Sequence, residues 1–194
     1  MSFGFDGEGY VDGQPVISNA ISNALRCKNQ RVLFFAAAAN EGGNQPEMFP
    51  ANHPGVISVR GTDDRGWLQR FNPPKGYAGL DCVMTLGQDV PGAGLSGGPP
   101  EVVKSGTSVS TSIAAGIAAM AMGYARLYEG EVAKMTRWVA ELGTVTRMRA
   151  MLRMMSTEMD GRWYYLSAQE FARRSHRMRL GMIAEAVSGG SSDC

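Results

Sequence analysis

The stretch of sequence that decides the fold is Val32-Leu33-Phe34-Phe35-Ala36-Ala37-Ala38-Ala39, and Asn40 follows it directly. Every residue of this run is apolar, and so short a run is typical of a parallel strand that is buried on both faces between layers of helices. Asn40 would then stand at the carboxyl end of a buried strand. Open α/β sheets place their binding and catalytic sites at that end.

A helix is expected on the amino-terminal side of this strand, over residues 15–27. Its apolar residues recur at steps of three and four, and Pro15 suits the first turn of a helix. A helix followed by a buried strand indicates a doubly wound α/β fold with a parallel sheet. Further strands are expected at 56–61 and near 81–85, the second of them inside a glycine- and proline-rich loop, 72–100, that would wrap a site.

The second half of the chain is expected to be mainly helical. A long helix is predicted over 107–127, where many small residues would allow the helix to lie close to the sheet. Beyond it, apolar periodicity predicts helices at 130–142, 145–156 and 168–187. We therefore divide the chain into residues 1–127, which carry the α/β fold, and residues 128–194, an all-helical extension.

Four motifs in a fixed order resemble the second half of a subtilisin-like serine peptidase of the subtilase family. They are the strand that ends in Asn40, Phe49-Pro50-Ala51, Asp81-Cys82-Val83-Met84-Thr85-Leu86-Gly87 and Gly106-Thr107-Ser108. Each motif alone is weak evidence, but their shared order and spacing make chance a poor explanation. The resemblance covers about residues 1–126 and implies part of a doubly wound, parallel-sheet subtilisin-like fold.

The same resemblance implies a site for acyl transfer. Ser108 would be the nucleophile, and Asn40 would donate a side-chain N–H to the oxyanion that forms when the serine attacks. The expected substrate-binding residues are Ser2, Phe3, Gly4, Ala39, Gly106 and Thr107. Two plainer interpretations stay open at this point: Ser108 could cap the long helix, and Asn40 could end its strand in an Asx turn.

The chain departs from the family pattern in two ways that concern this site. Ala39 replaces the glycine that the family usually has before the asparagine, and its methyl group should narrow the pocket for the substrate side chain. In the family, the Asp and the His of the catalytic triad lie upstream of the segment that begins at Ser2, and neither has a counterpart here. His53 is expected in an exposed loop and His176 in a basic helix, so we assign the role of general base to neither.

Composition points to no cofactor, metal, nucleic acid or membrane. The formal net charge is +1, from 19 basic and 18 acidic residues, and the arginine-rich segment 173–179 is more typical of a solvated helix face than of a phosphate site. Methionines at helical spacing in 148–155 are expected either in the core or on a pliable contact surface. Three cysteines without metal-ligand spacing, and no segment of membrane-span length, predict a cytoplasmic or otherwise intracellular protein.

Two functions follow from this sequence. The first is the C-terminal part of a subtilisin-like serine endopeptidase, which would act on peptide or protein substrates only when an upstream segment supplies the Asp and the His. The alternative is a catalytically dead, subtilase-like interaction module. In either case the sheet edges left uncovered would require self-association or a partner chain.

Overall fold

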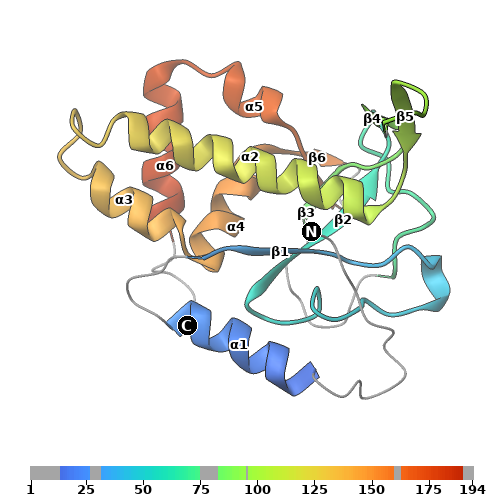
Figure 1. Ribbon diagram of the computed structural model, residues 1–194. Coiled ribbons are helices and arrows are strands. Elements are labelled where there is room, and N and C mark those ends of the chain that lie inside the picture. The colour runs from blue at the N-terminus through green and yellow to red at the C-terminus, as the bar shows by residue number, and fades with distance from the viewer. Residues whose placement is uncertain (1–13, 27–31, 75–82, 95, 160–162, 190–194) are drawn as a thin grey trace.

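The computed structural model describes residues 14–26, 32–74, 83–94, 96–159 and 163–189 (Figure 1). The described chain forms a five-stranded sheet with helices on both faces and a separate two-stranded hairpin. The helices are α1 (Gln14–Arg26), α2 (Thr107–Leu127), α3 (Met135–Leu142), α4 (Val145–Met154), α5 (Ala168–Ala172), α6 (His176–Ser188) and the 3-10 helix η1 (Gly42–Asn44). The strands are β1 (Phe34–Ala37), β2 (Val56–Thr62), β3 (Val83–Leu86), β4 (Val90–Ala93), β5 (Glu101–Lys104), β6 (Ser156–Met159) and β7 (Trp163–Leu166).

The sheet has the strand order β1-β2-β3-β7-β6. Strands β1, β2, β3 and β7 run parallel, whereas β6, at one edge, is antiparallel to β7. Phe34 pairs with Val56 and Val59 pairs with Val83, which sets the register of the first three strands. A parallel sheet between layers of helices confirms the α/β class that the sequence predicts.

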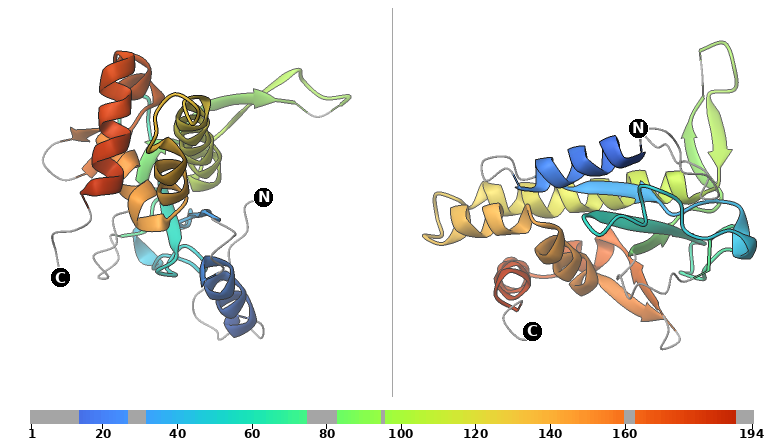
Figure 2. Two further views of the ribbon diagram at one scale, coloured as in Figure 1. Left: turned by 90° about the vertical axis from the view of Figure 1, so that its left-hand side faces the viewer. Right: turned by 90° about the horizontal axis from the view of Figure 1, so that it is seen from below.

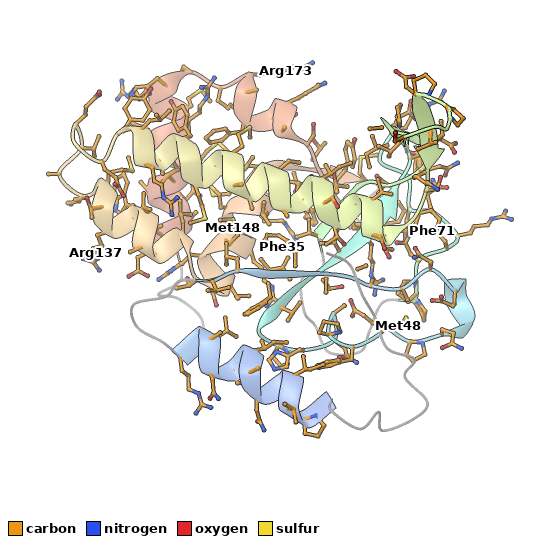
Figure 3. The ribbon with its side chains drawn as sticks, viewed as in Figure 1. Phe35, Met48, Phe71, Arg137, Met148 and Arg173 are labelled. Carbon is orange, nitrogen blue, oxygen red and sulfur yellow. The ribbon has the colours of Figure 1, made fainter. Side chains whose placement is uncertain are left out.

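Alternate residues of β2 belong to two different hydrophobic clusters. Ile57 and Val59 lie in the larger cluster, which includes residues of α2, α3, α4 and α6, while Val56 on the opposite face packs with α1. All of β2 is therefore buried, as expected of a strand covered on both faces. Figure 3 shows Phe35 of β1 and Met148 of α4 on the same side of β1, and both side chains pack in the larger cluster.

Helix α2 begins and ends at the residues that the sequence predicts. Its buried alanines Ala114, Ala118, Ala121 and Ala125 allow it to pack closely along β1, β2 and β3. By length and composition the helix could cross a membrane, so the expectation that no segment reaches membrane-span length is wrong for α2. Its contacts with the sheet are those of a core helix.

The carboxyl-terminal part is mainly helical, but the prediction that it is all helix is wrong. Strands β6 and β7 form an antiparallel hairpin, and Tyr165 of β7 pairs with Met84 of β3, so the hairpin extends the sheet. The aromatic run Trp163-Tyr164-Tyr165 favours a strand, and the helical spacing of the nearby methionines hid this signal. The helix predicted over 168–187 is divided into α5 and α6, and the Ser175 hydroxyl caps α6.

The methionine-rich segment 148–155 contributes to the core, as predicted. Met148, Met151 and Met155 are completely buried. They share one hydrophobic cluster with residues of α2 and β2, so the core continues across residue 127. The division of the chain at residue 127 stays a prediction.

The segment 72–100 contains β3, which matches the strand predicted near 81–85, and in addition β4, the first strand of the hairpin β4–β5. This hairpin is antiparallel, with Val90 opposite Lys104. Pro91 and Gly92 lower the strand propensity of β4, and for this reason the sequence did not reveal it. The hairpin projects from the body of the molecule (Figure 2), and its second strand leads through Ser105 and Gly106 into α2.

A surface turn follows β2. The carboxylate oxygen Oδ1 of Asp63 accepts the backbone N–H groups of Arg65 and Trp67 at 3.0 and 2.8 Å. The neighbouring Asp64 is exposed. The Asp63 carboxylate therefore shapes this surface turn.

Candidate functional site

The candidate site lies at the carboxyl edge of the sheet, where several segments meet at the start of α2. Asn40 follows β1, Gly87 follows β3, and Ser108 is the second residue of α2. The N–H of Gly106 donates to the carbonyl oxygen of Gly87 over 2.7 Å, and the N–H of Thr107 donates to Asn40 Oδ1 over 2.8 Å. The predicted oxyanion residue and the predicted nucleophile thus lie at one edge of the sheet.

Thr107 fixes the side chain of Asn40 with its hydroxyl as well as with its backbone. Thr107 Oγ1 lies 3.1 Å from Asn40 Oδ1 and 3.2 Å from the carbonyl oxygen of Ala39, so two acceptors share one hydroxyl proton. Thr107 is completely buried, and water does not compete for these bonds. Because the amide oxygen of Asn40 faces Thr107, its NH2 group points away from Thr107, as donation to a substrate requires.

Ser108 lies in the first turn of α2 and is half-buried. The N-cap of this helix is Gly106, so the interpretation of Ser108 as the capping residue is not supported. Asn40 Oδ1 accepts from a residue far along the chain, which does not support a local Asx turn either. The structure therefore favours a shared site of Ser108 and Asn40 over a helix cap at Ser108 and an Asx turn at Asn40.

Gly106 is required at the start of α2 for conformation and for space. Its φ angle of 139° lies in a region that residues with a Cβ rarely adopt. A Cβ at this position would also stand 3.1 Å from Asn40 Oδ1. The expected place of Gly106 in the site is therefore matched by its geometry, whereas its contact with substrate stays a prediction.

Ala39 holds a backbone conformation that favours glycine. Its φ angle is 154°, and its side chain is buried beside Asn40. A residue with a Cβ pays on the order of 1–3 kcal/mol for such a conformation, and the hydrogen bond from Thr107 to its carbonyl oxygen helps to hold it. This strain gives a physical reason for glycine to be the usual residue here. The narrowing of a substrate pocket by the Ala39 methyl group stays a prediction.

Neither histidine of the chain lies near Ser108. His53 is half-buried rather than exposed as expected; it precedes β2, at the amino edge of the sheet, and its Nδ1 accepts the N–H of Gly55. Because β1 and β2 are parallel, roughly 20 Å of strand separates this edge from Asn40. His176 Nδ1 lies 2.7 Å from the hydroxyl of Tyr124, which follows Ser108 by 16 residues along α2, or roughly 24 Å. We therefore assign the general base to neither histidine.

The remaining predicted site residues are Ser2, Phe3 and Gly4, which lie outside the described residues, as do Cys27, Cys82 and Cys194. Among the described residues no group of three or more His, Cys, Asp or Glu side chains could hold a metal ion. Two arginines of the segment 173–179 form interactions with other residues of the fold. Arg174 pairs with Glu170 at 3.6 Å, and Arg179 donates to the carbonyl oxygens of Phe171 and Ala172.

Sequence reasoning missed a buried charged side chain near the site. Arg60 is almost fully buried in the middle of β2, and its Nη1 and Nη2 atoms donate to the carbonyl oxygens of Pro73 and Pro74 at 3.0 and 2.9 Å. A charged residue inside an otherwise uncharged, mostly apolar strand was the available signal. Arg60 therefore holds the loop that leaves the carboxyl edge of β2.

Glu47 completes this buried group. One of its carboxylate oxygens lies 4.0 Å from Arg60 Nη2, and the other accepts the hydroxyl of Ser58. Burial raises the pKa of the Glu47 carboxyl above its usual value, and the nearby Arg60 and Arg149 oppose that rise without cancelling it. The residue that follows Glu47, Met48, donates its N–H to the carbonyl oxygen of Ala38 at 2.9 Å. This bond connects the backbone next to Glu47 with the segment that leads from β1 to Asn40.

We compared the chain with models of known protein families. The family model described as Subtilase family, Peptidase_S8, matches residues 1–154. The chain belongs to the subtilase family. The match extends beyond the limit near residue 126 that the motifs indicated and includes α3 and α4. Comparison with curated proteins gives no match.

Solved structures show the same subtilase fold. The S218A mutant of the protease domain of PatA is similar with a TM-score of 0.64 and 24% identity, over 100% of this chain and 60% of that chain. The Prenylagaramide maturation protease PagA is similar with a TM-score of 0.59 and 19% identity, over 95% of this chain and 71% of that chain. The PatG macrocyclase in complex with peptide has a TM-score of 0.62 and 19% identity, over 97% of this chain and 50% of that chain. The chain thus spans about 60% of the PatA protease domain.

Proposed function

We propose that this chain is the C-terminal part of a subtilisin-like serine endopeptidase, with Ser108 as the nucleophile and Asn40 as the oxyanion donor. The observation that carries the proposal is the bond of 2.8 Å from the Thr107 N–H to Asn40 Oδ1. This bond sets the amide of Asn40 beside the residue that precedes Ser108. The placement follows the general rule that sites lie at the carboxyl ends of parallel strands.

The proposed chemistry is attack by Ser108 Oγ on the carbonyl carbon of a peptide bond. The N–H of Asn40 would stabilise the negative charge that develops on the carbonyl oxygen. Removal of one such donor lowers turnover about 100- to 1000-fold, a value that was itself measured in this family. The serine proton must pass to a base, and both histidines of this chain lie far from Ser108. The base and its partner Asp would therefore come from another segment, and the isolated chain would be inactive.

Three solved structures support a peptide substrate for the complete protein. They are the protease domain of PatA, the maturation protease PagA and the PatG macrocyclase, the last of which was solved with a peptide. The alternative is an interaction module that keeps the subtilase fold without catalysis. The two functions differ in one property: only the peptidase gains a reactive Ser108 when the missing segment is supplied.

Labelling with a fluorophosphonate tests the proposal. The test uses the polypeptide encoded directly upstream of residue 1, which must contain the family motifs D-T/S-G, with the triad Asp, and H-G-T, with the triad His. This polypeptide is co-expressed with the chain. We expect the pair to react with the probe at Ser108, and the chain alone to remain unlabelled. Ser108→Ala should abolish labelling, whereas Ser188→Ala, at the exposed end of α6, should leave it intact. If the two polypeptides bind each other but the fluorophosphonate never labels Ser108, the result favours the interaction module.

A further inference from the structure

The turn that follows β2 presents an aromatic ring to solvent. Trp67 is 47% exposed, although its ring lies edge to face with the ring of Trp163 of β7, with 6.1 Å between the centroids. Trp163 is half-buried, and its Nε1 donates to the carbonyl oxygen of Gly66 over 3.0 Å. The turn and β7 therefore hold the two indole rings in a fixed arrangement that water still reaches.

The backbone of this turn fits closely onto the hairpin β6–β7. Gly66 has a φ angle of 85°, and a Cβ there would lie 3.0 Å from Cγ of Tyr165 and 3.2 Å from Cε of Met159. Glycine suits both the conformation and the close contact. Tyr165 and Met159 are half-buried and continue the surface that the indoles begin. We call Trp67, Trp163, Tyr165 and Met159 the aromatic patch.

Two carboxylates make the surroundings of the aromatic patch negative. Burial raises the pKa of the Tyr165 phenol, and the charges of Asp64 and Asp63 raise it further, so both carboxylates act on the space beside this ring. Neither of them forms an ion pair with a residue that the structure describes. Arg65 is the only basic residue of the turn 63–67. Aromatic faces next to unpaired carboxylates attract a cation.

The aromatic patch adjoins the edge of the sheet that carries Ser108. The carbonyl oxygen of Thr62, the residue before the turn, accepts the N–H of Gly87 over 2.9 Å, and the carbonyl oxygen of Gly87 accepts the N–H of Gly106 over 2.7 Å. With about 3.8 Å per residue along the chain and about 5 Å across each of these bonds, Asp63 lies within roughly 20 Å of Ser108. An extended peptide of about six residues spans that distance.

We infer that the aromatic patch, together with Asp63 and Asp64, binds an arginine side chain of the peptide substrate within about six residues of the cleaved bond. The inference rests on the proposed function. A planar guanidinium would stack on an indole face while its N–H groups meet the carboxylates. The contact lies away from the reacting carbonyl and is the same before and during the reaction. It would therefore lower KM and leave kcat unchanged.

Peptide binding to the chain alone tests this site without any catalysis. The probes are acetylated and amidated Arg-Gly-Arg-Gly-Arg and its counterpart with glutamine in place of arginine, both titrated by calorimetry. The arginine peptide should bind at least about fivefold more tightly. Trp67→Ser and Asp64→Asn should each remove most of this difference, and Arg65→Gln should increase it. Val16→Ser, at a side chain of α1 that is 71% exposed, and Glu129→Gln, at an exposed carboxylate after α2, should change nothing.

Two results of these titrations would overturn the site. One is equal affinity for the two peptides, and the other is equal affinity of the wild type and Trp67→Ser for the arginine peptide. A second copy of the chain could also place its arginine-rich segment 173–179 on the aromatic patch, and sedimentation of the chain alone detects this. If the chain dimerises and both Trp67→Ser and Arg177→Ala abolish the dimer, a second copy is the occupant and the inference is wrong.

The complex with the upstream polypeptide connects the site to Ser108. Substrate peptides with one arginine at successive positions on either side of the cleaved bond should include one, within about six residues, whose KM is about fivefold lower at equal kcat. Trp67→Ser should abolish that preference. If kcat changes instead of KM, the arginine contacts the reacting centre and the assignment to the aromatic patch is wrong. Arginine-selective binding by a complex whose Ser108 is never labelled supports the site and contradicts the peptidase.

Discussion

At the scale of single residues, Thr107 controls the geometry of the candidate site. Its N–H and its hydroxyl both contact the side chain of Asn40, and the hydroxyl also contacts the carbonyl oxygen of Ala39. Asn40 itself is exposed, so without these bonds its amide would rotate among several orientations. A buried threonine thus makes an exposed asparagine a preorganised donor.

Replacement of Thr107 by valine should remove the hydroxyl and keep the shape of the side chain. We expect the free energy of unfolding to fall by about 1 kcal/mol, because one shared hydrogen bond is lost and its acceptors stay in place. Urea unfolding measures the change. Thr111→Val is the matched control: its hydroxyl bonds the Thr107 carbonyl within the same helix, and its loss should cost less. Equal effects of both variants would contradict a special role for Thr107.

Glu47 predicts a pH dependence of stability. Its pKa in the folded protein is raised above 4.5, chiefly by burial, so the folded state binds the proton more tightly than the unfolded state. The stability that this group contributes is complete below about pH 4.5 and is lost as the pH rises through the folded pKa. The difference in unfolding free energy, wild type minus Glu47→Gln, should therefore fall as the pH rises from about 4.5 through the folded pKa of Glu47. A difference that grows with pH would mean that attraction by Arg60 outweighs burial.

At the scale of elements, the start of α2 fits tightly against the ends of two strands. An ideal Cβ at Gly87 would lie only 2.0 Å from Ser110 Oγ and 3.0 Å from the Cα of Gly61. Ser110 is completely buried and lies in the first turn of α2, close to Ser108. Glycine after β3 therefore sets how close the helix, and with it the nucleophile, comes to the carboxyl edge of the sheet.

Gly87→Ala should force α2 away from the sheet and destabilise the protein by at least about 2 kcal/mol, as overpacking of a core does. Ser110→Ala removes the atom that the new methyl group would meet first. The double variant should therefore recover part of the loss, with a coupling energy of about 1 kcal/mol or more in a double-mutant cycle measured by urea unfolding. Additive effects of the two substitutions would show that Ser110 does not limit the approach of the helix.

The sequence predicts elements better than it predicts contacts between them. Strand β2 and helix α2 agree with the prediction almost to the residue, because each combines an apolar pattern with a clear stop. The hairpin β6–β7 was missed because its four-residue strands adjoin a stronger helical pattern. The bond between Thr107 and Asn40 joins residues 67 positions apart, and only the family resemblance connected them. The family resemblance did not connect Glu47 with Arg60, so their contact was not predicted.

At the scale of the whole molecule, a single core joins the subtilase motifs to the helices that follow them. The large side chains that are completely or almost completely buried include Met135, Leu142, Met148, Met151, Leu152, Met155, Leu166 and Ile183, all of which come after residue 127. They share one cluster with Ile57 and Val59 of β2 and with the alanines of α2. Strand β7 also pairs with β3. Through these contacts, residues in the ranges 128–159 and 163–189 help to hold α2, and with it Ser108, in place.

A fragment that ends at Leu127 tests this dependence. The fragment lacks the side chains that cover the apolar residues of α2 and β2, and exposure of even a few such residues, at about 1.5–3 kcal/mol each, approaches the 5–15 kcal/mol by which domains are usually stable. We expect the fragment 1–127 to show no cooperative thermal transition and to bind a hydrophobic dye, whereas a fragment that ends at residue 189, which retains every described residue, should unfold like the whole chain in one transition. Calorimetry distinguishes the two results. If 1–127 melts sharply on its own, the boundary that the sequence suggests at residue 127 separates two independent units, and the helices after it are not needed to hold Ser108 in place.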